Sequence, residues 1–249
     1  MNFTRVRRHQ ITTAARELGL NVFAESAANP EMNLTQIIDG QTGIEHSMGL
    51  TPLYEDVVRM YAASEAGITP TLLVVYNGPS GEANFHQNER LWEDEKLLNF
   101  ARRDDLLRLR RPTRYWPDDL YAREMAREMK KLFDAGVLVQ LGGHGQMLGL
   151  DAHWELELFV QGGFSPHDAL QVATRNGAVY HGLDEHLGSI EAGKLADLVV
   201  LTENPLEDIR NTRAILYVMK NGALYSGEDA SRVYPDPRPA GRMYFHTRR

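Results

Sequence analysis

Apolar residues follow two alternating patterns along the amino-terminal part of the chain. Apolar residues at helical spacing predict helices over 4–18, 34–38 and 53–66, each stopped by a glycine: Gly19, Gly40 and Gly67. Short apolar runs predict buried strands over 20–24, 43–45 and 71–75. Because helix and strand alternate strictly, we expect parallel strands joined by right-handed crossovers.

A long polar segment over 78–117 interrupts this alternation. It is too long for an ordinary connection, so we expect a functional loop or lid that contains some helix. Its arginines are expected to form a solvated, ion-paired surface helix, and the alternative is a clamp for an anionic substrate or a subunit contact. They are Arg102, Arg103, Arg108, Arg110, Arg111 and Arg114.

A fourth helix and strand lead into a glycine-rich turn. We expect the helix to start at Asp118 as its cap and the strand to cover 137–141. Gly142 and Gly143 then permit a sharp turn before His144. Loops at the carboxyl ends of parallel strands line the pocket in α/β folds, so His144 is a candidate for proton transfer or metal binding.

The next helix is predicted over 151–161, with Asp151 as its cap. It carries one imidazole and two carboxylates, His153, Glu155 and Glu157. We expect structural roles for all three, with Glu155 in solvent and His153 hydrogen-bonded to a loop carbonyl.

The pattern changes towards the carboxyl terminus. Ser165 and Pro166 predict the start of one more helix. Short strands are then expected over 197–201 and 214–220, followed by a hairpin at Asn221-Gly222. We therefore divide the chain into an α/β part over 1–186, a small β-layer over 187–226 and a proline-rich tail over 227–249 that is extended on a neighbour or disordered.

Composition narrows the classes of partner. The net charge of -7 argues against nucleic-acid binding through the overall field of the protein. No apolar run is long enough for a membrane span, and we expect a cytoplasmic protein. The chain has no cysteine, so any metal must be held by His, Asp or Glu.

The motifs at 43–47, 70–74, 165–183 and 188–209 resemble those of the imidazolonepropionase-like branch of the amidohydrolase superfamily. The carboxyl-terminal signature is similar over 165–183 and over 188–209, GSIEAGKLADLVVLTENPLEDI. GIEHS at 43–47 resembles the sixth-strand motif of this branch, and PTLLV at 70–74 the seventh strand. The resemblance implies a (β/α)8 barrel with a metal centre, flanked by a small β-sandwich, in which Asp197 ties the β-layer to the barrel.

Two departures from the family pattern matter. The first-strand His-x-His pair and the fourth-strand lysine of the family have no counterpart here, so the expected fold class is α/β, the second half of a TIM-type barrel with a small β-sandwich-like layer. Glu25 stands where many relatives have a histidine ligand, and Gly142-Gly143-His144 stands where they have Gly-Thr-Asp. HWELELF at 153–159 resembles a subgroup often attached to an amino-terminal β-propeller.

The resemblance implies a metal-dependent hydrolase of amide, cyclic amide or peptide-like C–N bonds. His46 and Glu25 would be metal ligands, His144 a ligand or the catalytic base, and the divalent ion zinc. The substrate would be a small molecule or peptide-like. A half barrel leaves an open sheet edge, so the chain should be part of a longer one or form a homo-oligomer. The alternative is a catalytically incomplete relative that serves as a binding or assembly module.

Overall fold

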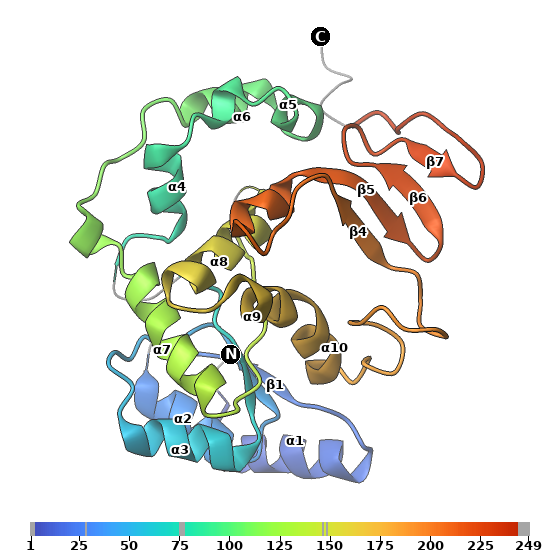
Figure 1. Ribbon diagram of the computed structural model, residues 1–249. Coiled ribbons are helices and arrows are strands. Elements are labelled where there is room, and N and C mark those ends of the chain that lie inside the picture. Colours follow the sequence, from blue (N-terminus) through green and yellow to red (C-terminus); the bar gives the residue numbers. More distant parts are fainter. Residues whose placement is uncertain (1–2, 28, 75–77, 146, 148, 244–249) are drawn as a thin grey trace.

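The computed structural model describes residues 3–27, 29–74, 78–145, 147 and 149–243. Two sheets organise them (Figure 1). The first is parallel, with strand order β1-β2-β3, and the second is antiparallel, with order β4-β5-β6-β7. The mixed α/β class and the parallel sheet predicted from the sequence are thus confirmed. Within the described part of the chain, no helix is long and apolar enough to cross a membrane.

Helix and strand alternate along the parallel sheet as predicted. The elements are α1 (Arg5–Glu17), β1 (Phe23–Glu25), α2 (Pro30–Ile38), β2 (Gly43–Glu45), α3 (Glu55–Ser64) and β3 (Gly67–Thr69). Glu25 pairs with Glu45, and Glu45 with Thr69, so the carboxyl ends of the strands lie in one row. Val139 continues the sheet through a parallel bridge to Ile68, the remnant of the strand expected over 137–141.

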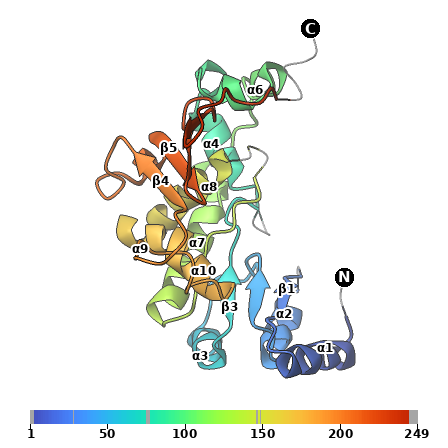
Figure 2. The same ribbon diagram turned by 90° about the vertical axis from the view of Figure 1, so that its right-hand side faces the viewer.

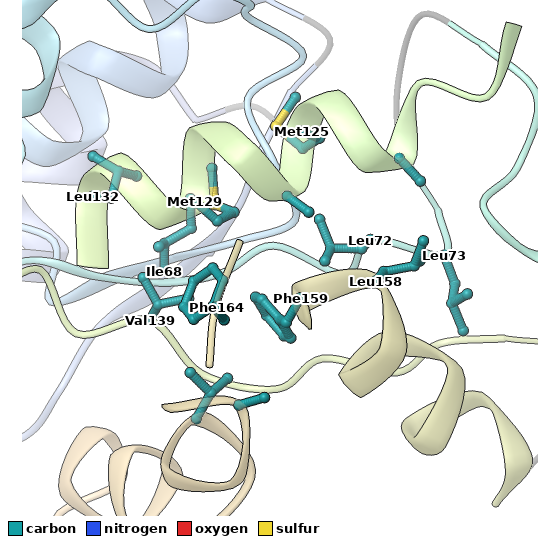
Figure 3. Packing of buried hydrophobic residues seen from close by; sticks show 14 of the residues in the cluster. Ile68, Leu72, Leu73, Met125, Met129, Leu132, Val139, Leu158, Phe159 and Phe164 are labelled. Carbon is teal, nitrogen blue, oxygen red and sulfur yellow. The ribbon is translucent and has the colours of Figure 1, made fainter. Parts of the chain in front are cut away.

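The two faces of the parallel sheet are covered differently. Ile44, Ile68 and Val139 are fully buried on one face, and Figure 3 shows Ile68 and Val139 packed beside Met129 of α7 (Ala122–Asp134). On the other face, a Cβ on Gly67 would lie 2.6 Å from the ring of Tyr180. Glycine is therefore required where this tyrosine crosses the strands.

The strand expected over 71–75 is wrong. β3 ends at Thr69 because Pro70 has no N–H to continue the ladder. Leu72 and Leu73 are fully buried in a turn, and Val75 lies outside the described residues. Gly67 begins β3 instead of stopping α3, whose C-cap is Glu65 in the left-handed conformation, φ 58°.

The polar insertion contains several short helices, which run from α7 and α8 (Leu150–Gln161) towards the antiparallel sheet (Figure 1, and from the side in Figure 2). They are α4 (Glu82–Asn88), η1 (Leu91–Glu93), α5 (Leu97–Phe100), α6 (Arg103–Arg108) and η2 (Pro117–Asp119). Lys96 Nζ donates to the carbonyl of Ile215 at 3.2 Å. Arg102 and Arg108 form surface ion pairs with Asp105, as expected for a solvated helix.

The remaining helices are α8 (Leu150–Gln161), α9 (Pro166–Gln171), η3 (Val172–Asn176) and α10 (Gly177–Tyr180). Ser165 caps α9 as predicted, because its Oγ accepts from the N–H of Asp168. Asp118 and Asp151 are not caps: Asp118 lies within η2, and Asp151 lies in the first turn of α8 behind the N-cap Gly149.

The antiparallel sheet is formed by the carboxyl-terminal part of the chain, with the short helix η4 between its first two strands. Its elements are β4 (Leu198–Leu201), η4 (Ile209–Arg213), β5 (Ile215–Lys220), β6 (Ala223–Ser226) and β7 (Arg232–Tyr234). Positive φ at Asn221 and Gly222 confirms the predicted hairpin. Part of the proline-rich tail, for which we expected either an extended segment on a neighbour or disorder, forms β7 on β6. Asp197 binds Lys220 and the N–H of Asn221, so it ties β4 to the hairpin within the layer.

Candidate functional site

Glu25 and His46 lie side by side where β1 and β2 end. Their strands pair in parallel, which brings Oε1 of Glu25 to 3.7 Å from Nε2 of His46. The Glu25 side chain is 70% exposed, whereas that of His46 is 11% exposed. The N–H of His46 donates to the carbonyl of Thr69 at 2.7 Å, which fixes the residue in a left-handed conformation, φ 69°. The imidazole is thus held rigidly, and the carboxylate reaches it from solvent.

His144 joins this group from the loop after the Val139 bridge, which lies next to β3. Its ring centroid lies 5.2 Å from that of His46, with 58° between the ring planes. The structure therefore brings the two predicted histidines together, with Glu25 at the rim.

The surroundings of His46 favour the neutral form of its imidazole. Burial lowers the pKa of His46, the neighbouring His144 lowers it further, and Glu25 and Glu45 act in the opposite direction. Its Nδ1 is buried and has no hydrogen-bond partner among the described residues. A neutral imidazole can accept a proton or bind a metal through its unprotonated nitrogen.

The loop that carries His144 is bound to α8 by two carboxylates. Glu155 accepts from the N–H of Gly142 at 3.2 Å and of Gly143 at 2.7 Å, and Asp151 accepts from the N–H of Gly145 at 2.9 Å. Glu155 is completely buried, so its predicted exposure to solvent is wrong. Burial raises the pKa of Glu155 to about 7, despite these backbone donors.

The sequence did contain a signal for the burial of Glu155. The large apolar residues Trp154, Leu156, Leu158 and Phe159 are spread around the helix instead of forming one stripe, and all four are buried. A helix of that kind lies inside the protein, and its carboxylates must then find partners there.

His153 and Glu157, on the same helix, serve structural contacts elsewhere, as expected. His153 Nδ1 lies 3.0 Å from the hydroxyl of Thr212 instead of bonding a loop carbonyl. Glu157 pairs with Arg213, which also binds Glu89 at 2.8 Å. This ion-pair network joins α8, the insertion and η4.

Comparison with known proteins identifies the family. Residues 32–224 match the model of the amidohydrolase family. The chain belongs to the amidohydrolase family. This confirms the resemblance inferred from the sequence motifs.

The similar amidohydrolase relatives are longer than this chain. Ochratoxinase of Aspergillus niger is 38% identical over 98 residues, which cover 37% of this chain and 20% of that protein. Among solved structures, a Xaa-Pro dipeptidase with bound methionine has a TM-score of 0.63 at 22% identity, covering 90% of this chain and 49% of the other. A putative prolidase from Bifidobacterium longum has a TM-score of 0.61 at 23% identity, covering 98% and 53%. The chain thus spans about half the length of these structures, and at such identities they show the shared fold.

The side chains at this site are of types that bind divalent metals, but they are few. Two imidazoles and a carboxylate are ligands that zinc accepts, and the unpartnered Nδ1 of His46 is a free donor. No three His, Asp or Glu side chains among the described residues lie close enough together to hold an ion. The residues therefore fit a metal in kind, and further ligands would be needed.

A small pocket is lined by residues of the parallel sheet and of η3, and neither His46 nor His144 belongs to its lining. Its volume is about 300 Å³. Its lining is Glu45, Thr69, Gln140, Leu141, Gly142, Val172, Ala173, Gly177 and His181. The hydroxyl of Tyr180 donates to Glu45 at 2.8 Å, and Gln140 donates to Thr69 at 2.5 Å. The sequence pattern did not predict this polar group, because its members come from distant segments.

Proposed function

We propose that the chain forms the second half of a (β/α)8 amidohydrolase barrel that hydrolyses amide or peptide-like C–N bonds with a divalent metal. The observation that carries this proposal is that His46, at the carboxyl end of β2, lies close both to Glu25 at the end of β1 and to the ring of His144. The family match and the coverage of about half of the similar structures support it. The division into a half barrel over 1–186, a β-layer over 187–226 and a tail over 227–249 belongs to the same proposal.

The residues have distinct roles in this scheme. A bound divalent ion, for which zinc suits these donors, supplies Lewis acidity towards the scissile carbonyl and lowers the pKa of water. His46 and Glu25 would be ligands, because the neutral imidazole and the carboxylate are adjacent. His144 would be a ligand or the base that takes a proton, since its imidazole faces His46 across 5.2 Å.

The remaining metal ligands would come from residues outside the described part of this chain. Too few described ligands gather for an ion, so we infer that the first half of the barrel supplies the others. Either this chain is part of a longer chain that contains the first half, or a second copy of this chain completes the site in a homo-oligomer. The substrate would be a small molecule or peptide-like, as the names of the dipeptidase and prolidase structures suggest.

Hydrolysis of dipeptides and N-acyl amino acids, measured with and without added zinc, tests this proposal. We expect zinc-stimulated release of the amine, reduced at least about 100-fold in His46→Ala and His144→Ala, the scale on which general acid–base groups contribute. His167→Ala, which changes an exposed histidine, is the matched control and should retain activity. Equal activity in all variants would contradict the assignment, and complete inactivity of the wild type would favour the binding-module alternative.

A further inference from the structure

The backbone around His144 adopts a conformation that needs external support. Gly143 has φ 82° and His144 has φ 68°, so both residues lie in the left-handed region. For a residue with a side chain this conformation is uncommon, and it persists where surrounding contacts impose it. The contacts that impose it here come from one helix.

Helix α8 presents its two carboxylates to the loop on both sides of His144. Asp151 and Glu155 are four residues apart and therefore share a face of the helix. Glu155 accepts from the N–H of Gly143, and Asp151 accepts from that of Gly145, the residues directly before and after His144. The imidazole is thus held between two fixed points of the backbone.

The loop is also confined sterically. A Cβ on Gly145 would lie 2.6 Å from the Cβ of Asp151 and 2.6 Å from Oε1 of Glu82. A Cβ on Gly142 would lie 2.6 Å from the hydroxyl of Thr71. Glycine at both positions lets the loop approach α8 closely enough for the hydrogen bonds to form.

Burying the carboxyl group of Glu155 costs solvation free energy. The side chain is 0% exposed, and no cationic side chain pairs with it among the described residues. Its carboxylate oxygens instead accept from consecutive backbone N–H groups, Gly142 and Gly143. Burying an ionisable group without a counter-charge is rare in a core and frequent beside functional groups.

We propose that Asp151 and Glu155 are positioning residues that hold the imidazole of His144 against His46. This inference rests on the proposed function only in so far as His144 acts in the metal site. The hydrogen bonds themselves can be tested without metal, so the two ideas can fail separately.

The experiment compares Glu155→Gln and Asp151→Ala with Glu157→Gln. Glu157 is a matched control because it is also buried on α8 but binds Arg213 instead of the His144 loop. Amide hydrogen exchange by NMR reports on Gly143 and Gly145, and titration with Co²⁺ alone reports on the metal site. Thermal unfolding of each variant allows the comparison at matched stability.

We expect exchange at Gly143 to accelerate at least about tenfold in Glu155→Gln, and exchange at Gly145 in Asp151→Ala, with little change in Glu157→Gln. Co²⁺ affinity should fall about 10–100-fold in the first two variants, as for other residues that orient metal ligands. Equal exchange and equal affinity in all three variants would overturn the proposal. If the wild-type chain binds no Co²⁺, the metal assignment fails, and the exchange rates still decide the positioning role. If Glu155→Gln does not fold, Asp151→Ala gives the same test at Gly145.

Discussion

At the scale of single residues, His153 links the stability of the fold to pH. Burial lowers the pKa of His153 from 6.5 to about 4, and the nearby Arg213 adds to the effect. The unfolded chain therefore binds a proton between pH 4 and 6.5 that the folded chain does not. This contribution to stability is present above pH 6.5 and is lost as the pH falls through 4.

A substitution of His153 should remove that dependence. We expect the stability of the wild type relative to His153→Gln to rise as the pH increases from 4 to 6.5, measured by urea unfolding across this range. The exposed His167→Gln serves as the control and should run parallel to the wild type. A difference between wild type and His153→Gln that stays constant or falls with pH would contradict the predicted pKa shift.

The candidate site could be predicted from the sequence only where a residue ends a strand. Glu25, His46 and His144 follow apolar runs, and parallel pairing brings such positions together without further information. Glu155 was expected in solvent because a carboxylate on a helix usually points outward. Its partners are backbone N–H groups of a loop, and no side-chain pattern in the sequence records those.

At the scale of elements, the contact between the strands and Tyr180 is tight enough to test. Gly67→Ala would place a Cβ 2.6 Å from the tyrosine ring and 3.0 Å from the carbonyl of Leu138, so we expect a loss of about 1–3 kcal/mol in unfolding free energy. Gly177→Ala in α10 is the control, since nothing lies within 4 Å of its Cβ and alanine favours a helix. Denaturant unfolding measures both, and an unchanged stability of Gly67→Ala would show that Tyr180 does not pack there.

Element boundaries followed from the sequence where local signals agreed with pairing. Gly43–Glu45 was predicted residue for residue, because the apolar run and the strand coincide. The strand expected over 71–75 did not form because Pro70 ended the ladder before it, and Leu72 and Leu73 are buried in a turn instead. Pairing of the tail as β7 depends on the exposed edge of β6, which sequence periodicity does not reveal.

At the scale of the whole molecule, Arg213 joins three parts of the chain. It binds Glu89 of the insertion and Glu157 of α8 from its place in η4. Arg213→Ala would leave the buried carboxylate of Glu157 and the half-buried one of Glu89 without their cation, and we expect a loss of about 1–3 kcal/mol in unfolding free energy together with faster proteolysis of the insertion. Arg127→Ala removes a surface ion pair, so it should change the unfolding free energy by no more than about 0.5 kcal/mol and leave the rate of proteolysis unchanged. Equal behaviour of both variants would mean that the network does not hold the parts together.

The central claim is that the chain carries part of a metal site built around His46, and the metal content per chain measures it most directly. Plasma mass spectrometry would be applied to protein purified without chelator or nickel affinity, in parallel with His46→Ala and His167→Ala. We predict zinc or a similar divalent ion at about one per chain in the wild type and in His167→Ala, and its loss in a folded His46→Ala. Protein that is folded yet free of metal, or that keeps its metal in His46→Ala, would contradict the account.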